Sequence, residues 1–160
     1  MNHHFAAMRL ISTLLAVTHL AGCATTPPPL GNGTQVRLER ADETWVAQKG
    51  DSPTVVLQSG FGDGKAVWAG VMDELSGYTV FAYDRPGYGA SPAGDAPRDP
   101  CSIATELRGQ LHAAGLQPPY LLVGHSLGGL YQYVFARLYP TEVTGLVLLD
   151  PTHPRHWETI

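Results

Sequence analysis

The sequence predicts an α/β fold, in which helices cover both faces of a mostly parallel sheet. Three observations support this. Short apolar runs alternate with longer segments of helical periodicity, and each apolar run ends in a loop rich in Gly, Asp or Ser. The 160 residues are 44% hydrophobic and only 15% charged, which is enough apolar material for one core. Strands that alternate with helices form parallel units whose sites lie at the carboxyl ends of the strands.

The N-terminal part of the domain has the pattern of a hairpin followed by a buried strand. Polar and apolar residues alternate over residues 35–40, as in a half-buried strand, and residues 44–47 predict its hairpin partner. Residues 54–57 are continuously apolar, which is typical of a strand buried on both faces. Residues 78–83 predict the next strand. Between these two strands we expect a helix with one apolar side, made of Val67, Trp68, Val71, Met72 and Leu75.

Two helices and two strands are predicted in the second half of the chain. Residues 120–123 and 145–149 are apolar runs that predict buried strands. The first helix is expected to end at Gly115 and the second at Pro140. Asp150 ends the last strand. The helices are indicated by apolar residues at helical spacing: Ile103, Leu107, Leu111 and Ala114 in the first, and Leu130, Val134 and Leu138 in the second.

Residues 1–22 are typical of a secretory signal peptide, with Arg9 before a short apolar stretch. The stretch ends in Leu-Ala-Gly-Cys, which resembles the bacterial lipoprotein box. This resemblance implies that Cys23 is lipidated and anchors the protein to a membrane. Residues 23–33, rich in Pro, Thr and Gly, then form a tether, and residues 34–160 form the domain. The alternative is an ordinary cleaved signal with an incidental cysteine.

The expected location is therefore the bacterial cell envelope. Ala24 follows the cysteine where an aspartate would indicate inner-membrane retention, so the periplasmic side of the outer membrane is favoured. A formal net charge of −4 with no basic block excludes nucleic acid as a partner. The other cysteine, Cys101, is expected to be a packed small residue near a helix start. No spacing of residues indicates a disulfide, a metal or another cofactor, and no motif defines an oligomeric state.

Ser126 is the candidate nucleophile. It lies in Gly124-His125-Ser126-Leu127-Gly128, directly after a predicted buried strand and before a predicted helix. This is the context of a nucleophile elbow, in which a sharp turn raises the serine above the sheet. The alternative is a chance G-x-S-x-G sequence in an ordinary turn.

A serine nucleophile needs donors for the oxyanion that forms when it attacks a carbonyl. The backbone N–H of Leu127, at the start of the predicted helix, is one candidate. The other is the N–H of Phe61, in the loop after the strand at residues 54–57. Gly60 and Gly62 would let this backbone approach a substrate closely. The alternative is a plain glycine-rich turn.

Three segments together resemble the α/β-hydrolase superfamily, in its serine esterase and haloperoxidase-like branch. They are residues 60–62, residues 83–91 and residues 124–129. The resemblance implies Ser126 as nucleophile, the amides of Phe61 and Leu127 as an oxyanion hole, and hydrolysis of ester, thioester or amide bonds without a cofactor. A small ester-like molecule is the implied substrate. Ser59 stands where the family usually has histidine, which leaves the donated amide in place.

The triad acid and base are less well defined by the resemblance. Asp150 is a candidate acid, because a few relatives place the acid at this strand, but a turn-capping role before Pro151 is the favoured alternative. Asp84 is expected to stabilise a turn beside the site. His125 is expected to be structural. His153 and His156 are interpreted as surface loop residues rather than as the base.

The family's catalytic histidine and its last strands would follow residue 160, so we expect a domain whose C-terminal strands are missing. The strand at residues 145–149 would then be an exposed apolar edge. The expected function is that of a serine hydrolase with little or no turnover in this chain. The alternative is a non-catalytic, membrane-anchored lipoprotein that uses the partial fold as a binding or assembly module.

Overall fold

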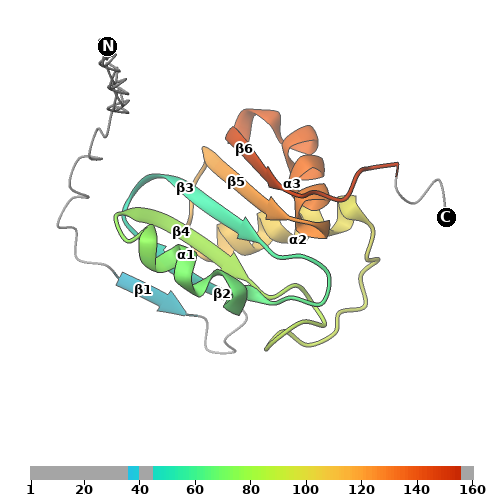
Figure 1. The fold of residues 1–160 in the computed structure, drawn as a ribbon, viewed down its shortest axis with the longest axis horizontal. Helices are drawn as coiled ribbons and strands as arrows, with labels where there is room; N and C mark the ends of the chain where they lie inside the picture. Colours follow the sequence, from blue (N-terminus) through green and yellow to red (C-terminus); the bar gives the residue numbers. More distant parts are fainter. Residues whose placement is uncertain (1–35, 40–44, 156–160) are drawn as a thin grey trace, which may run out of the picture.

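A six-stranded sheet with helices on both faces forms the domain (Figure 1). This computed structural model describes residues 36–39 and 45–155. The proposed signal peptide, Cys23, the tether and His156 lie outside the described residues. The strands are β1 (Val36–Glu39), β2 (Trp45–Lys49), β3 (Asp51–Gln58), β4 (Tyr78–Tyr83), β5 (Tyr120–His125) and β6 (Val143–Leu149). The helices are α1 (Ala69–Glu74), α2 (Pro100–Ala113) and α3 (Leu127–Leu138), with 3₁₀ turns η1 (Lys65–Trp68) and η2 (Pro140–Glu142).

The strand order is β1-β2-β4-β3-β5-β6. β1 pairs antiparallel with β2, which confirms the predicted hairpin, and β2 pairs antiparallel with β4. β4, β3, β5 and β6 run parallel. The predicted α/β fold class is confirmed. Because the four parallel strands point the same way, the loops that follow them gather at one edge of the sheet.

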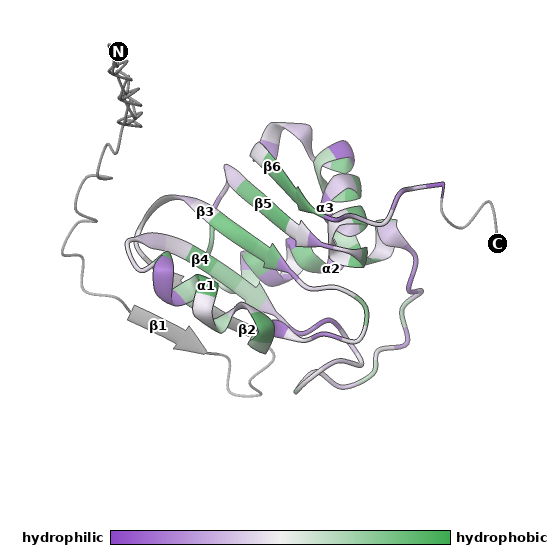
Figure 2. Cartoon of the chain, in the orientation of Figure 1, coloured by the Kyte–Doolittle hydropathy of each residue, from purple (hydrophilic) through white to green (hydrophobic). Residues whose placement is uncertain are grey.

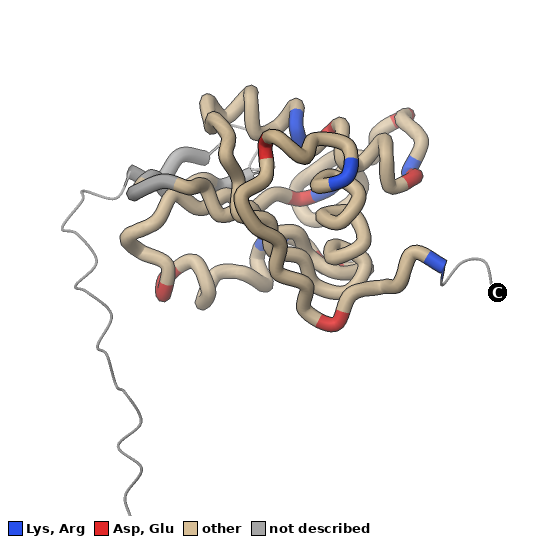
Figure 3. The backbone as a smooth tube through the Cα atoms, turned by 90° about the horizontal axis from the view of Figure 1, so that it is seen from above, with Lys and Arg blue, Asp and Glu red and all other residues tan. Residues whose placement is uncertain are grey.

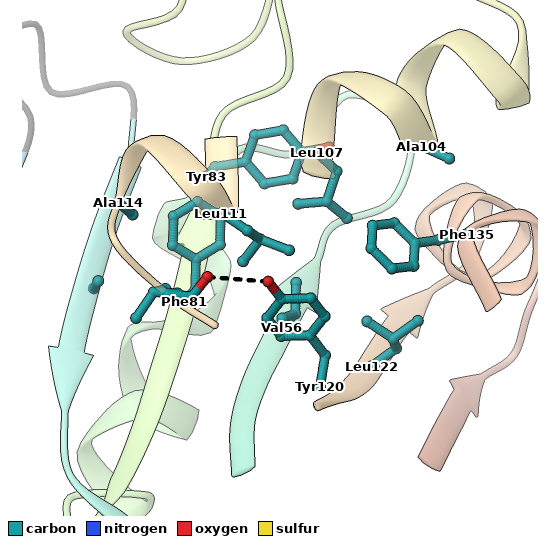
Figure 4. Packing of buried hydrophobic residues seen from close by; sticks show 12 residues of the cluster. Val56, Phe81, Tyr83, Ala104, Leu107, Leu111, Ala114, Tyr120, Leu122 and Phe135 are labelled. Carbon is teal, nitrogen blue, oxygen red and sulfur yellow. Dashed lines mark hydrogen bonds between the residues drawn. The ribbon is translucent and has the colours of Figure 1, made fainter. Parts of the chain in front are cut away.

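The larger part of the core lies between the sheet and the pair α2 and α3. Figure 4 shows Val56, Tyr120 and Leu122 from the strands facing Leu107 and Phe135 from the helices. All five are fully buried. The hydroxyl of Tyr120 donates to a backbone carbonyl at the end of the α2 segment, so this buried polar group is satisfied.

In the described part of the chain, η1 and α1 cover the opposite face of the sheet. Trp68 and Met72 pack there against alternate strand residues, among them Val55 and Leu57. The expectation of one continuous apolar helix side was wrong, because Val67 is 53% exposed and Val71 41% exposed. The segment is a 3₁₀ turn followed by a six-residue helix, so a single helical periodicity does not run through it.

Two other sequence expectations need correction. Leu138 is 44% exposed at the end of α3, whereas Gln132 and Phe135 are buried in its place. α3 contacts β5 and β6, and Gln132 and Phe135 belong to its buried side. Cys101 is a free thiol at the start of α2, as expected from sequence, but it is exposed rather than packed. Cys101 is exposed because it comes before Ile103, the first residue of the helix that is buried.

β6 is the outermost strand of the described sheet and has a described partner, β5, on one side only. Figure 2 shows that it is strongly apolar. Val147, Leu148 and Leu149 are each about two-fifths exposed. This matches the exposed apolar edge expected from sequence. In the described part of the chain no helix is long and apolar enough to cross a membrane. Charged residues of both signs are dispersed along the described backbone (Figure 3).

Candidate active site

The loop after β3 and the segment at the end of β6 lie against the turn that carries Ser126. The backbone N–H of Ser126 donates to the carbonyl of Leu149, the last residue of β6, at 3.0 Å. The carbonyl of Ser126 accepts from the N–H of Thr152, also at 3.0 Å. These two bonds attach the turn that carries the serine to the loop after β6. The position of the serine is therefore fixed by two strands of the sheet.

Ser126 has a backbone conformation that few L-residues adopt, with φ 50° and ψ −120°. It stands between the end of β5 and the first residue of α3, Leu127. The turn requires small neighbours: a Cβ on Gly124 would lie 2.6 Å from the carbonyl oxygen of Gly128 and from Cα of Gly129. A strained residue that the surrounding fold holds in place is typical of a functional site. The helix that follows presents its N-terminus to the same point.

The loop after β3 lies against the serine. A Cβ on Gly60 would lie 3.3 Å from Cβ of Ser126 and 3.1 Å from Nδ1 of His125. The next residue, Phe61, is 80% exposed, so its ring is not packed in the core. The residue before Phe61 is thus close to Ser126, and Leu127 follows Ser126 directly in the chain.

Ser59 closes the base of this loop. Its hydroxyl accepts from the indole Nε1 of Trp68 at 2.8 Å and donates to the carbonyl of Gly64 at 2.9 Å. The side chain is buried, and both of its bonds are to groups within the loop and η1. Ser59 therefore has a structural role in shaping the loop.

Asp84 joins the loop after β3 to the loop after β4. Its carboxylate, 3% exposed, accepts from the backbone N–H and the ammonium of Lys65 and from the N–H of Ala90. Gly64 and Gly89 lie against the same carboxylate, where a Cβ would collide with it. The glycines of both loops are thus required by a single buried acid.

Arg85 is a site residue whose contacts sequence reasoning missed. Its guanidinium is buried and donates at 2.5 Å from Nη1 to the carbonyl of Ser59 and from Nη2 to the carbonyl of Gly60. The rings of Tyr88 and Tyr131 lie 4.5 and 5.6 Å from its central carbon. The sequence signal that could have indicated this contact is a cation two residues after β4, next to the glycine-rich loop that follows β3.

In the described part of the chain, neither Asp150 nor His153 is hydrogen-bonded to the hydroxyl of Ser126. Asp150 has a positive φ of 43° and is exposed at the end of β6. Nδ1 of His153 accepts from the N–H of Arg155 at 3.1 Å. Within residues 45–155, no hydrogen bond joins a histidine to the hydroxyl of Ser126 or to the carboxylate of Asp150.

Two tyrosines behind the site have altered acidity. Burial raises the pKa of the Tyr83 phenol far above its usual range, although nearby Arg85 opposes the shift. The phenol accepts from Nε2 of Gln58 at 2.8 Å. Burial also raises the pKa of Tyr131, again opposed by Arg85. Of these two rings, only that of Tyr131 packs on the guanidinium of Arg85, and the ring of Tyr83 stacks on Phe81. No group of three metal-ligating side chains occurs among the described residues.

These features define a class of protein: a parallel α/β sheet with a strained serine between a strand and a helix at its carboxyl edge. The profile of the alpha/beta hydrolase fold family matches residues 53–159. The chain belongs to this family.

Individual relatives agree with this membership. The chain is 36% identical to protein YqjL of Bacillus subtilis over 106 residues, covering 65% of this chain and 42% of YqjL. It is 32% identical to human (lyso)-N-acylphosphatidylethanolamine lipase over 125 residues, covering 72% of this chain and 36% of the lipase. The structure of a membrane phospholipase A matches with a TM-score of 0.61 and 29% identity, covering 74% of this chain and 40% of that one. The chain thus spans about two-fifths of the length of these relatives.

Proposed function

We propose that the protein is a serine hydrolase of ester-like bonds and that Ser126 is its nucleophile. The observation that carries this proposal is the strained backbone of Ser126, with φ 50°, between β5 and the N-terminus of α3. The fold maintains this conformation through bonds to the loop after β6 on both sides of the serine peptide. A strain of this kind costs of the order of 1–3 kcal/mol and persists where the surroundings enforce it.

The proposed chemistry is acyl transfer in two steps. Oγ of Ser126 attacks the substrate carbonyl, and the bond to the leaving alcohol, thiol or amine breaks to give an acyl-serine. The hydroxyl proton reaches the leaving group through solvent, because no histidine among the described residues is hydrogen-bonded to Ser126. Water then attacks the acyl-serine, which releases the acid and restores the hydroxyl. The N–H groups of Phe61 and Leu127 would stabilise the negative oxygen in both steps.

Slow turnover is part of the proposal for this chain. Among the described residues, no histidine base is hydrogen-bonded to Ser126. Oxyanion binding without such a base retains only a small part of the activity of a complete triad. Asp150 is the candidate acid in the described part of the chain. We therefore expect modification of Ser126 by activated reagents to be easier to detect than ester turnover.

We also propose a substrate class and a location. Two relatives named above are lipases of phospholipids, which supports a small lipid or other ester as substrate. A lipid on Cys23 would hold the domain at a bacterial membrane, on the periplasmic side, with residues 23–33 as the tether. Mass spectrometry of the N-terminus of the purified protein tests the anchor. An unmodified Cys23 would rule it out.

A fluorophosphonate reagent tests the nucleophile. The full chain is incubated with the reagent, and the modified residue is identified by peptide mass spectrometry. We expect one adduct, on Ser126, that is absent in Ser126→Ala. Ser91→Ala, in the loop after β4, is the matched control and should be modified at the same rate as the wild type. An unmodified wild type, or an adduct elsewhere, would contradict the proposal.

The alternative function is a non-catalytic binding or assembly module. The exposed apolar edge at β6 favours it, together with a groove of about 370 Å³ on the α1 face, lined by residues such as Val55 and Leu121. This alternative requires a folded chain whose Ser126 does not react. The fluorophosphonate experiment, combined with circular dichroism of the same sample, therefore distinguishes the two functions.

A further inference from the structure

Arg85 holds the backbone that carries the proposed oxyanion donor. Its two terminal nitrogens bind the carbonyls of Ser59 and Gly60, which directly precede Phe61. From this contact we infer that Arg85 is a positioning residue: it aims the N–H of Phe61 at the oxyanion of a substrate on Ser126. The inference rests on the proposed function and extends it to a residue that does not itself touch the substrate.

The geometry of the peptide unit makes the link between Arg85 and the donor. The peptide between Gly60 and Phe61 is trans. In a trans peptide the C=O and the following N–H lie in one plane and point in opposite directions. Since the carbonyl of Gly60 points at Arg85, the N–H of Phe61 points away from it. The direction of the donor is thus determined by the position of the guanidinium.

The peptide needs such a restraint because its neighbours are flexible. Gly60 and Gly62 flank Phe61, and Gly62 has a positive φ of 81°. Glycines allow the peptide planes next to them to rotate at little cost. A rotated peptide would present the carbonyl of Gly60, instead of the N–H of Phe61, to a developing negative charge. Phe61 supplies no anchor of its own, since its side chain is 80% exposed.

Arg85 is itself well fixed. The side chain is buried, and the rings of Tyr88 and Tyr131 pack on its guanidinium. In the described part of the chain it forms no ion pair, because the adjacent Asp84 is bonded to Lys65. Its buried charge is therefore balanced by two carbonyl dipoles and two ring faces, and all four hold it against the same loop.

The other contacts of the loop act at its ends. Ser59 is bonded through its hydroxyl to Trp68 and Gly64, and Lys65 is bonded to Asp84. These contacts fix where the loop starts and ends. Among the described contacts, Arg85 alone holds the carbonyl of the peptide that donates the proposed N–H.

Replacing Arg85 should lower the rate of the bond-forming step and leave the reversible binding that precedes it almost unchanged. Removal of one oxyanion donor lowers the rate of acyl transfer by roughly 100- to 1000-fold, and a misdirected donor should retain part of its effect. We therefore expect Arg85→Gln to lower the rate of phosphonylation by about 10- to 100-fold. The reversible binding of the reagent, which precedes the charged transition state, should change by less than about threefold.

The experiment measures the two constants of fluorophosphonate inactivation, kinact and KI, on the full chain. In this reaction the Oγ–P bond forms, the P–F bond breaks, fluoride leaves, and the hydroxyl proton goes to solvent. The variants are Arg85→Gln and Arg85→Lys, the latter retaining the charge and one donor. Arg98→Gln is the control, because Arg98 and Arg85 both line a pocket of about 230 Å³, but Arg98 is paired with Glu106 at the surface. We expect kinact to fall in the order wild type and Arg98→Gln, then Arg85→Lys, then Arg85→Gln.

A second measurement needs no variant and covers the case in which the Arg85 variants do not fold. Phenylboronic acid forms a tetrahedral, negatively charged adduct on a reactive serine. We expect the amide proton resonances of both Phe61 and Leu127 to move downfield when the adduct forms on the wild type. An unmoved Phe61 resonance would overturn the inference, as would a folded Arg85→Gln with unchanged kinact. A wild type that reacts with neither reagent at Ser126 would overturn the proposed function as well.

Discussion

Asp84 and Lys65 are joined twice across the space between two loops. The backbone N–H of Lys65 donates to Oδ1 at 2.6 Å, and its ammonium lies 2.8 Å from Oδ2. The same carboxylate accepts the N–H of Ala90 at 3.1 Å. Asp84 is almost completely buried, whereas the side chain of Lys65 is 22% exposed. One acid therefore determines the relative position of the loops that follow β3 and β4.

The variant Asp84→Ala should be strongly destabilised. It leaves two backbone N–H groups and an ammonium without their acceptor, and each hydrogen bond to a charged group contributes about 1.5–3 kcal/mol. We expect the free energy of unfolding to fall by about 3–5 kcal/mol, measured by urea denaturation. Lys65→Met removes only the partly exposed ammonium and should cost about 1 kcal/mol. If Asp84→Ala and Lys65→Met lowered the free energy of unfolding equally, the backbone bonds from Lys65 and Ala90 to Asp84 would contribute nothing to stability.

A pair of glycine variants tests the packing of the serine turn. In Gly124→Ala the new methyl would lie 2.6 Å from the carbonyl oxygen of Gly128, so β5 and α3 must separate. We expect a loss of about 2 kcal/mol or more in urea denaturation, as for other overpacked sites. Gly109→Ala is the control, because that position on α2 is exposed and has nothing within 4 Å. It should stabilise the protein by about 0.5–1 kcal/mol.

The sequence predicted the strands more accurately than the helix faces. β4 has the predicted bounds, Tyr78–Tyr83, because a continuous apolar run is buried whichever neighbour it pairs with. The apolar residues of the η1 and α1 segment were assigned to one buried side, yet Val71 is 41% exposed. Helical spacing shows which residues share a face. It does not show where the helix begins and ends, and α1 has only six residues after the 3₁₀ turn η1.

The site could be predicted in part for a similar reason. The strand–serine–helix order is local, so Ser126 and its turn were recognisable from five consecutive residues. The contact between Arg85 and the carbonyls of Ser59 and Gly60 joins residues 25 and 26 positions apart. It depends on β3 and β4 being neighbours in the sheet. No local pattern encodes which backbone carbonyl a buried arginine will bind.

The start of α2 should show a dependence on acid pH. Oδ1 of Asp99 accepts from the N–H groups of Cys101 and Ser102, and Oδ2 accepts from the hydroxyl of Ser102 at 2.6 Å. The bond from the Ser102 side chain is the main reason why the pKa of Asp99 is lowered from 3.8. The ionised cap therefore adds stability above that pH, and the contribution is lost as the pH falls through the lowered pKa.

We expect Asp99→Ala to melt a few degrees below the wild type at pH 7, since it removes an N-cap. The difference should shrink as the pH falls below 3.8, because the wild-type cap then becomes protonated. Thermal melts followed by circular dichroism over a pH series measure this. Ser102→Ala removes the main cause of the lowered pKa and keeps the carboxylate. Its melting temperature should therefore differ from that of the wild type by less than that of Asp99→Ala over the same pH range. A difference that stays constant with pH would contradict the role of ionised Asp99.

The exposed edge at β6 should make the chain self-associate. Val147, Leu148 and Leu149 are each about two-fifths exposed, and the outer edge of β6 has no partner among the described residues. Val147 pairs with Val123 on the face away from α3, so a lysine there removes no contact with that helix. A charge on an edge strand opposes pairing with a second edge.

We therefore expect Val147→Lys to remain folded and to lower the fraction of aggregated protein, measured by light scattering and sedimentation velocity. Val67→Lys is the matched control, because Val67 is a similarly exposed valine, 53%, that lies on η1 and not on a sheet edge. If the two variants reduced aggregation equally, net charge rather than the strand edge would be the cause. If only Val147→Lys acts, the edge of β6 is the surface through which copies of the chain associate.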